Sequence, residues 1–322
     1  PEARKRIGFL QDGDILLLEN VRIHTEETII FEEEVRLTPA EQAQTYVVRN
    51  LAPLADLYVC DAFAAAHRSE PTLVGFPQVL PSAAGRLFEE ELRVLTRVRD
   101  QPDRPCLFLL GGAKILDAFK MMRAALESGT ADSVLTAGLT GEIMLIAAGH
   151  ELGHTTLSLL EEKNLLQFVE PARDLLEAFA GRLHYPLDVA ILSDGERKEL
   201  PRDSLPADAM IMDIGRQTVE NYRARIAAAG SLFVNGPAGI YEQEAAAHGT
   251  RALWQAMAAA DGFTVIGGGD SIAAARQFDL LDNFSYVCTA GGGLVRFLAG
   301  ESMAVVQALT GAAERYRSEV SK

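Results

Sequence analysis

The sequence predicts an α/β protein of two domains, built on parallel sheets that helices cover on both faces. Its 322 residues correspond to roughly two domains. Short apolar runs recur along the chain, and each ends in glycine, aspartate or asparagine before a helical period begins. Because these runs are continuously apolar rather than alternating, they are expected to be buried on both faces, which is typical of parallel sheets.

The expected strands are taken in chain order. They are ILLLEN (15–20), LYVCDAF (57–63), CLFLLGG (106–112), SVLTAGL (133–139), DVAIL (188–192), AMIMDIG (209–215), SLFVNGPAG (231–239), FTVIGGGD (263–270) and SYVCTAGGG (285–293).

Two helices have clear boundary signals. Thr38-Pro39-Ala40-Glu41 combines an N-cap threonine, a first-turn proline and the glutamate of a capping box. The amphipathic stretch 82–100 predicts a long helix. Gln101-Pro102-Asp103-Arg104-Pro105 follows it, and this proline-rich segment is where we expect the domain boundary.

The composition is that of a soluble globular protein and excludes several classes. The chain is 48% hydrophobic and 23% charged, and its net charge is −15. No apolar run reaches the roughly 18 residues that a membrane span needs, and the start has no signal-peptide core, so we expect a cytoplasmic protein. The negative charge opposes binding to nucleic acid or to an anionic membrane. An anionic ligand must therefore be held by a few local cations and helix N-termini.

Neither the cysteines nor the main acidic cluster predicts a metal site. Cys60, Cys106 and Cys288 lie in apolar runs without zinc-ligand spacing, so we expect reduced, buried side chains. The glutamates at 26, 27, 32, 33 and 34 lack spaced histidine or aspartate partners, and they are interpreted as a solvated face.

Three glycine-rich turns, each between a strand and a helix, predict a phosphorylated ligand. They are GGAK (111–114), GGGDS (267–271) and AGGG (290–293). Such turns let backbone N–H groups and a helix N-terminus approach an anion. Three of them exceed what folding requires, since each interior glycine costs about 0.5–1 kcal/mol. Neither a Walker A loop nor a dinucleotide fingerprint is present, because Ile272 stands at the third glycine position of the latter.

The polar residues at these turns allow more than one role. Lys114 suits a phosphate, although a solvated lysine at an ordinary turn fits the pattern as well. Asp270 suits Mg²⁺ beside phosphates, or else it caps a helix. Because ligands bind beyond the carboxyl ends of parallel strands, we expect Lys114, Asn235, Asp270 and Gly291–Gly293 to share one cleft.

Two arginines in the first third of the chain are candidates for a second anion site. Arg22 lies in ENVRIH (19–24) and Arg68 in DAFAAAHRSEP (61–71). Each directly follows the end of an expected strand. Arginine there suits bidentate capture of a phosphate or carboxylate.

Taken together, these motifs resemble the phosphoglycerate kinase family. The matching segments are LLLENVR (16–22), LADLYVCDAFAAAHRSEPTLVGFPQVLPSAAG (54–85), LLGGAK (109–114), DIGRQTVE (213–220), VNGPAGIYE (234–242), GTRA (249–252), VIGGGDS (265–271) and CTAGGG (288–293). They span nearly the whole chain, and AFAAAHRSEPTLVGFP and GGAKILDA are more similar to the archaeal branch.

The resemblance implies two doubly wound parallel-sheet domains joined by a long helix, with the first domain incomplete. The expected segments are residues 1–81, the remainder of an acid-substrate domain, 82–104, an interdomain helix and linker, 105–290, a nucleotide-binding domain, and 291–322, a C-terminal helix returning towards the hinge. The implied reaction is reversible phosphoryl transfer from 1,3-bisphosphoglycerate to Mg-ADP, giving 3-phosphoglycerate and Mg-ATP. A monomer with Mg²⁺ and ADP or ATP is expected.

The resemblance also implies roles for single residues. Arg22 and Arg68 match the arginines that bind the glycerate phosphate, Lys114 and the glycines 291 and 292 match groups at the transferring phosphate, and Asp270 matches the metal ligand. The implied nucleotide-binding set is Gly111, Gly112, Lys114, Gly138, Asn235, Glu242, Gly267, Gly268, Gly269 and Ser271, with Glu242 on the ribose hydroxyls.

Departures from the family pattern leave an alternative open. The family's opening strands, with an Asp/Asn pair, an arginine and a Ser-His-Leu-Gly-Arg-Pro stretch, do not occur here, so the chain is expected to begin late. Ala118 replaces a lysine that many relatives carry, Leu139 interrupts the glycine run at the adenine pocket, and Arg216 replaces a proline near a nucleotide-facing turn. The alternative is a catalytically lapsed relative that binds nucleotide or acts as a scaffold.

Overall fold

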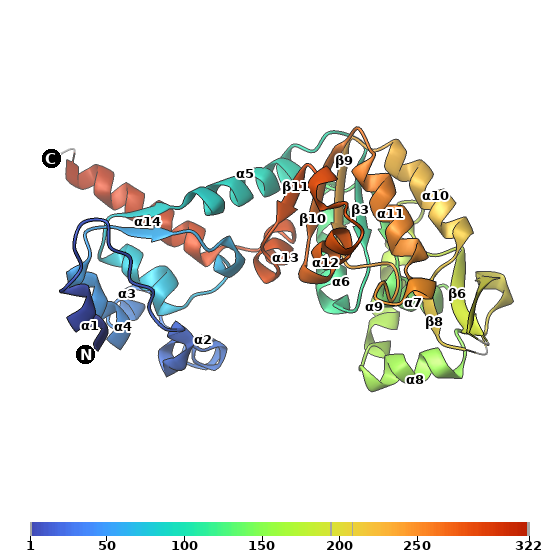
Figure 1. Ribbon diagram of the computed structural model, residues 1–322, viewed down its shortest axis with the longest axis horizontal. Coiled ribbons are helices and arrows are strands. Elements are labelled where there is room, and N and C mark those ends of the chain that lie inside the picture. The colour runs from blue at the N-terminus through green and yellow to red at the C-terminus, as the bar shows by residue number, and fades with distance from the viewer. Residues whose placement is uncertain (1, 194, 208, 321–322) are drawn as a thin grey trace. The chain divides into compact units, whose positions relative to one another are not determined.

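The computed structural model describes residues 2–193, 195–207 and 209–320 and divides the chain into two compact units. The first unit combines Pro1–Arg93 with Glu301–Lys322, and the second is Val94–Gly300. Residues 291–300, which the sequence grouped with the C-terminal helix, cluster with the second unit. Figure 1 labels the elements of both units.

The second unit is built on a six-stranded sheet with the order β11-β10-β9-β3-β4-β5, and every pair in it is parallel. The strands are β3 (Cys106–Leu110), β4 (Ser133–Thr136), β5 (Leu183–His184), β9 (Ser231–Asn235), β10 (Phe263–Gly267) and β11 (Tyr286–Cys288). All five residues of β3 are buried. The prediction of a parallel sheet with both faces covered is confirmed for these strands.

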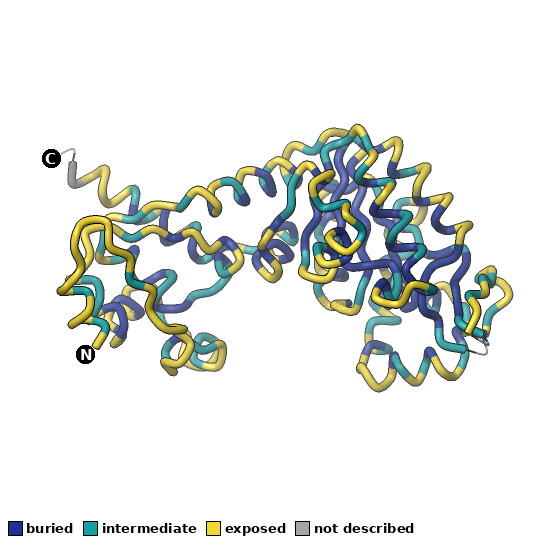
Figure 2. The backbone as a smooth tube through the Cα atoms, in the orientation of Figure 1, coloured by how far each residue is buried: buried dark blue, intermediate teal, exposed yellow. Residues whose placement is uncertain are grey.

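Helices cover the two faces of this sheet. The helices that lie wholly or partly in the second unit are α5 (Arg86–Asp100), α6 (Ile115–Glu127), α7 (Gly138–Ala147), α8 (His154–Glu162), α9 (Val169–Ala178), α10 (Arg216–Ala227), α11 (His248–Ala258), α12 (Gly269–Gln277) and α13 (Gly292–Leu298). Leu107 and Leu109 of β3 belong to the apolar cluster that contains Tyr222 and Trp254. Phe108 points the other way, as strand geometry requires, and meets Phe233 with ring centroids 4.9 Å apart. Figure 2 shows the buried strands in dark blue.

A small antiparallel sheet with the order β7-β6-β8 adjoins this core, and it corrects the expectation of parallel strands at 188–192 and 209–215. Its strands are β6 (Asp188–Ser193), β7 (Glu196–Pro201) and β8 (Ile211–Ile214). β6 and β7 are joined by a connection too short for a parallel crossover. β8 is buried along its whole length because α7 and α11 pack against it, so its apolar run did not indicate a parallel neighbour.

The first unit contains a two-stranded parallel sheet of β1 (Tyr58–Cys60) and β2 (Ser82–Ala84). Its helices are α1 (Glu2–Ile7), α2 (Ile29–Glu34), α3 (Pro39–Gln42), α4 (Tyr46–Leu51) and α14 (Ala304–Val320). α14 packs on β2 and on the turns over 71–78. The capping box predicted at the start of α3 is confirmed, since Thr38 and Glu41 make both of its hydrogen bonds.

Two element predictions in this unit were wrong. Residues 15–20 form no strand, and Ile15 and Leu17 are more than 90% exposed, because no described segment pairs with their backbone. The long helix begins at Arg86 rather than Ser82, because residues 82–84 pair with β1 instead. The Asp61 side chain fixes the new start by accepting a hydrogen bond from Phe88 N at 2.9 Å.

The cysteine prediction is confirmed, since all three cysteines are buried and free of disulfides. No helix in the described part of the chain combines the length and apolarity that a membrane crossing demands.

Glu142 on α7 is a buried acid that makes stability depend on pH. Its Oε2 is buried with no hydrogen-bond partner among the described residues, and burial raises its pKa to about 8. In the unfolded chain the carboxyl group ionises near its ordinary pKa of 4.5. Between these values the folded state holds a proton that the unfolded state has lost, so the free energy of unfolding falls as pH rises from 4.5 to about 8.

We expect Glu142→Gln to remove this pH dependence, because the amide is neutral throughout. At pH 8 the variant gains on the order of 2–4 kcal/mol in the free energy of unfolding relative to wild type, given about 1.4 kcal/mol per pKa unit. Urea denaturation at pH 5 and pH 8 measures the difference. The exposed Glu177 gives the matched control Glu177→Gln. An unchanged pH slope in Glu142→Gln would contradict the assignment.

Candidate active site

A hollow lies at the carboxyl ends of β3, β9 and β10. Because these neighbouring strands are parallel, their ends meet at one edge of the sheet. Its lining consists of Gly111, Gly112, Ala113, Lys114, Asn235, Gly236, Gly268, Gly269, Asp270 and Ser271. The structure thus brings together Lys114, Asn235 and Asp270, as the sequence predicted.

The glycines at 291–293 are not part of this lining, although the sequence placed them in the same cleft. They follow β11, which pairs with β10 on the side away from β9. Gly291 precedes α13, and a Cβ there would meet no atom within 4 Å. These residues lie at the same sheet edge, one strand beyond the hollow.

The two charged residues of the hollow have no structural partner. Lys114 and Asp270 are both exposed, and neither side chain makes a hydrogen bond or ion pair with any residue the structure describes. Asp270 does not cap its helix, since the N-cap position of α12 is Gly268 and no side chain caps it. Lys114 is the residue directly before α6. Both side chains therefore lie where free helix N–H groups favour an anion.

The backbone N–H groups of the glycines at 111, 112 and 138 are used within the fold. Their N–H groups donate to the backbone of neighbouring turns: Gly111 to Asn235 O at 2.9 Å, Gly112 to Pro237 O at 2.8 Å and Gly138 to Ala238 O at 3.0 Å. These N–H groups are not available to an anion. Glycine is needed because a Cβ on Gly138 would lie 2.8 Å from Gly112 N.

Some residues of GGGDS are required by the fold, and others have open space beside them. A Cβ on Gly267 would collide with Leu294, and Gly268 has φ +89°. Ser271 accepts a hydrogen bond from Gly236 N at 2.6 Å through its Oγ, which ties α12 to the turn after β9. Gly269, in contrast, has open space where a Cβ would be. Gly268, Gly269, Asp270 and Ser271 all line the hollow, and of these Gly269 and Asp270 are exposed.

Glu242 lies on the same side of the unit as Asp270. It is exposed and follows the turn after β9. The pKa of Tyr241 is raised by burial first, and then by the negative charges of Glu242 and Asp270. Both carboxylates are therefore near the Tyr241 hydroxyl.

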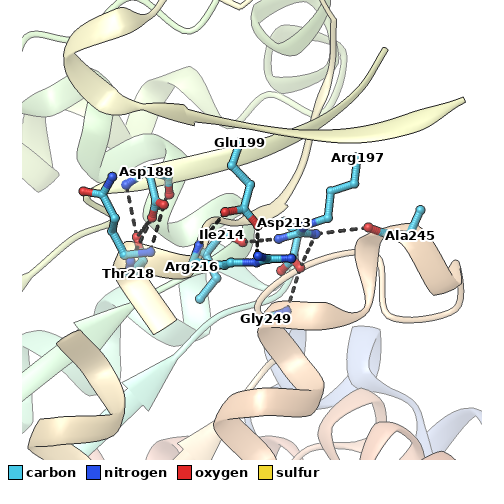
Figure 3. A network of polar contacts seen from close by, with 10 residues as sticks. Asp188, Arg197, Glu199, Asp213, Ile214, Arg216, Thr218, Ala245 and Gly249 are labelled. Atoms are coloured by element: carbon cyan, nitrogen blue, oxygen red, sulfur yellow. Dashed lines mark hydrogen bonds and ion pairs between the residues drawn. The ribbon is translucent and has the colours of Figure 1, made fainter. Parts of the chain in front are cut away.

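A buried ion-pair network, which the sequence analysis missed, fixes the turn after Glu242 (Figure 3). Asp213 at the end of β8 accepts from Arg197 at 2.9 Å and from Gly249 N at 2.7 Å. Arg197 also donates to Ala245 O at 3.0 Å. Burial raises the pKa of Asp213 to about 6 despite these donors. Arg197 also pairs with the nearby Glu199, but its partners Asp213 and Ala245 are 16 and 48 residues away along the chain, so the network could not be read from the local sequence.

Arg216 belongs to the rim of this network. Its backbone N–H donates to Glu199 Oε2 at 3.2 Å, and its guanidinium lies 3.6 Å from Glu199 Oε1 (Figure 3). The side chain is 73% exposed. The ion-pair partner of Arg216 is thus Glu199, a carboxylate of strand β7.

The first unit has a separate cluster around Arg22 and Arg68. Glu70 Oε1 accepts from Arg22 Nη2 at 3.0 Å and from Arg68 Nη1 at 3.2 Å. Arg22 lies in a short 3₁₀ turn, Val21–Ile23, capped by Asn20, and not at a strand end as expected. The structure therefore brings together two arginines that are 46 positions apart in the sequence.

The acidic cluster beside these arginines is not simply a solvated face. Glu27 is fully buried and accepts from Thr72 N at 2.9 Å and from Thr72 Oγ1 at 2.8 Å. Burial raises its pKa to about 7. Glu32 accepts from Ser69 N at 2.6 Å. The prediction failed because these backbone donors come from a segment about 40 residues further along the chain.

Comparisons with known proteins agree with this arrangement. The family model described as phosphoglycerate kinase matches residues 1–301. The chain belongs to the phosphoglycerate kinase family. Family membership identifies the chain as a kinase, and the resemblance stated from the sequence is confirmed.

Similar proteins come from archaea and from a bacterium. The phosphoglycerate kinase of Methanothermobacter thermautotrophicus is 41% identical over 95% of this chain and 73% of its own length, and that of Methanopyrus kandleri is 43% identical over 96% and 75%. The crystal structure of phosphoglycerate kinase from Pyrococcus horikoshii OT3 matches with a TM-score of 0.89 at 36% identity, covering 97% of this chain and 76% of that one. The enzyme from Coxiella burnetii matches with a TM-score of 0.76 at 31% identity, covering 84% and 69%.

Some glycines of these turns are required by the fold and others lie in open space. Measurements of stability without ligand can test this distinction. Gly236 has φ +90°, and a Cβ there would collide with Gly111. We expect Gly236→Ala to lower the free energy of unfolding by about 2 kcal/mol or more, from backbone strain and the clash. The matched control, Gly269→Ala, has open space and should stay within about 1 kcal/mol of wild type. Urea denaturation without ligand measures both, and equal losses would contradict the distinction.

Proposed function

We propose that the chain catalyses reversible phosphoryl transfer from 1,3-bisphosphoglycerate to Mg-ADP, giving 3-phosphoglycerate and Mg-ATP, in glycolysis and gluconeogenesis. One observation carries the proposal beyond family membership. Lys114 and Asp270 converge on one hollow, exposed and without a partner in the described structure, at the edge of the sheet where ligands bind. A monomer acting in the cytoplasm is the form we propose.

Lys114 is assigned to the phosphate that is transferred. In phosphoryl transfer the protein acts mainly by positioning and by stabilising charge on the phosphoryl oxygens. A lysine ammonium next to the first turn of α6 supplies both a point charge and the adjacent helix N–H groups. Ala118, where many relatives have a second lysine, is 3% exposed, so this helix face is occupied by packing. The charge is therefore assigned to Lys114 alone on α6.

Asp270 is assigned to Mg²⁺, and the residues present fit that ion. No group of three metal-ligating side chains occurs within the described ranges, and Asp270 is the one carboxylate in the lining of the hollow. Mg²⁺ is commonly held by one or two carboxylates together with substrate phosphates. When bound, the ion would neutralise phosphate charge. Asp270 would orient it, and the open space at Gly269 leaves room for phosphate beside that carboxylate.

The remaining nucleotide residues are assigned by position. Asn235 at the end of β9 contacts the nucleotide, and Glu242 accepts hydrogen bonds from the ribose hydroxyls. Gly291 and Gly292 face the transferring phosphate, which is supported by the open space at Gly291. The glycines at 111, 112, 138, 267 and 268 shape the nucleotide site through the backbone, and Ser271 does so through its hydroxyl.

On the acid side, Arg22 and Arg68 are assigned to the phosphate of 3-phosphoglycerate. Both guanidiniums keep donors that no described residue uses. Arginine binds phosphate through two parallel N–H groups, which fixes orientation as well as charge. The pairing at Glu70 supports the assignment because it puts both cations at one place.

Calorimetric titration with Mg-ADP tests the nucleotide side. Wild type should bind saturably, and Lys114→Ala should weaken binding by about tenfold to a hundredfold, the value of one charged hydrogen bond. Asp270→Ala should reduce the affinity for Mg-ADP to that measured for ADP in EDTA. Lys120→Ala, on the exposed side of α6, is the matched control. Absence of binding by folded wild type would overturn the proposal in favour of a lapsed relative.

Steady-state kinetics in the direction of ATP consumption test the acid side. Arg22→Ala and Arg68→Ala should each raise KM for 3-phosphoglycerate by about tenfold or more, because each removes a charged contact to phosphate. KM for Mg-ATP should change less than twofold. Arg49→Ala, an exposed arginine of the same unit on α4, controls for loss of a positive charge. If KM for 3-phosphoglycerate is unchanged in both variants, the arginines do not bind it.

A further inference from the structure

Glu70 occupies the point where the two proposed phosphate-binding arginines meet. A single carboxylate oxygen, Oε1, accepts from both guanidiniums, at 3.0 Å from Arg22 and 3.2 Å from Arg68. The Glu70 side chain is only 5% exposed, whereas the side chains of Arg22 and Arg68 are 41% and 22% exposed. Glu70 therefore contacts the arginines from the buried side, and their outer donors face solvent.

The backbone that carries Glu70 is held by side chains of three other segments. Ser69 N donates to Glu32 at 2.6 Å, and Gln42 Nε2 donates to Ser69 O at 2.7 Å. Thr72 donates to the buried Glu27 through both its N–H and its hydroxyl. Residues on both sides of Glu70 are thus fixed, so its carboxylate has a defined position.

Each arginine gives one N–H to Glu70 and keeps the others. A guanidinium carries five N–H donors in a planar fork. With Nη2 of Arg22 and Nη1 of Arg68 bound to the same oxygen, both planes are restrained while the remaining donors stay available. One negative charge between two positive ones also reduces the repulsion that would separate the guanidiniums.

We propose that Glu70 is a positioning residue for the phosphate of the acid substrate, acting through Arg22 and Arg68. It does not touch the substrate. It holds two flexible arginine side chains close together before the substrate arrives, so that binding does not have to restrict them. The inference rests on the proposed role of the two arginines.

The test is a set of kinetic measurements on Glu70→Ala and Glu70→Gln. Removing the carboxylate should raise KM for 3-phosphoglycerate by about tenfold while kcat and KM for Mg-ATP change less than twofold, since losing an orienting partner typically costs about 10–100-fold. Glu70→Gln keeps an acceptor oxygen for the arginines and should recover at least half of the loss on a logarithmic scale. Glu33→Gln, an exposed acid on α2, controls for the change in net charge.

Double mutants separate positioning from general structural damage. Because Glu70 acts through the arginines, Glu70→Ala should raise KM by much less in the Arg22→Ala and Arg68→Ala backgrounds than in wild type. Fully multiplicative effects would overturn the inference, as would a lower KM in Glu70→Ala, which would show that Glu70 competes with substrate for the arginines. If Glu70→Ala does not fold, the cycles are run with Glu70→Gln and the same criteria apply.

Different results would overturn the proposed acid site and the proposed positioning role of Glu70. If the arginine variants retain a normal KM for 3-phosphoglycerate, the proposed acid site is wrong. If the arginine variants are impaired and both Glu70 variants match wild type, the acid site stands and the positioning role is wrong.

Discussion

The hydrogen bonds between the turns after β3, β4 and β9 are the constraint on which the nucleotide side of the molecule depends. Three glycine N–H groups, at 111, 112 and 138, donate to carbonyls of the segment 235–238. This backbone lattice requires that the turns approach more closely than any side chain permits. Lys114 follows Gly112 by two residues. Its location is therefore fixed by the backbone hydrogen bonds of these turns and not by a contact of its own side chain.

The excess of negative charge is compatible with anion binding because many carboxylates accept hydrogen bonds from other residues inside the fold. Asp188 accepts from Thr218, Asp213 from Arg197, and Glu27 from Thr72. Such carboxylates replace solvent as acceptors for buried donors, and leaving those donors unpaired would cost about 1–3 kcal/mol each. The net charge of −15 is thus partly structural, and local cations determine what binds at the sheet edge.

How much of this could be predicted depended on whether a feature is local. The capping box at Thr38 and the strands of the large sheet were predicted because caps and apolar runs involve near neighbours. The antiparallel pairing of β6 and the missing strand at 15–20 were not, because pairing depends on a partner elsewhere in the chain. The same limit hid Arg197 and Glu70. The sequence shows that both residues are charged. It does not show which residues they contact, because some of their partners lie as far as 48 residues away along the chain.

The glycine-rich turns show that neighbouring glycines of one motif can meet different physical requirements. In GGGDS, three consecutive glycines meet three different demands: contact with Leu294 at 267, a positive φ at 268, and open space at 269. The first two would be required in a protein that had lost its ligand. Gly269 has open space and no positive φ, so neither packing nor backbone conformation requires glycine there. Gly291 is the N-cap of α13, where glycine is itself preferred over alanine. Of these glycines, Gly269 alone meets no demand of the fold, which is consistent with the phosphate proposed to bind beside Asp270.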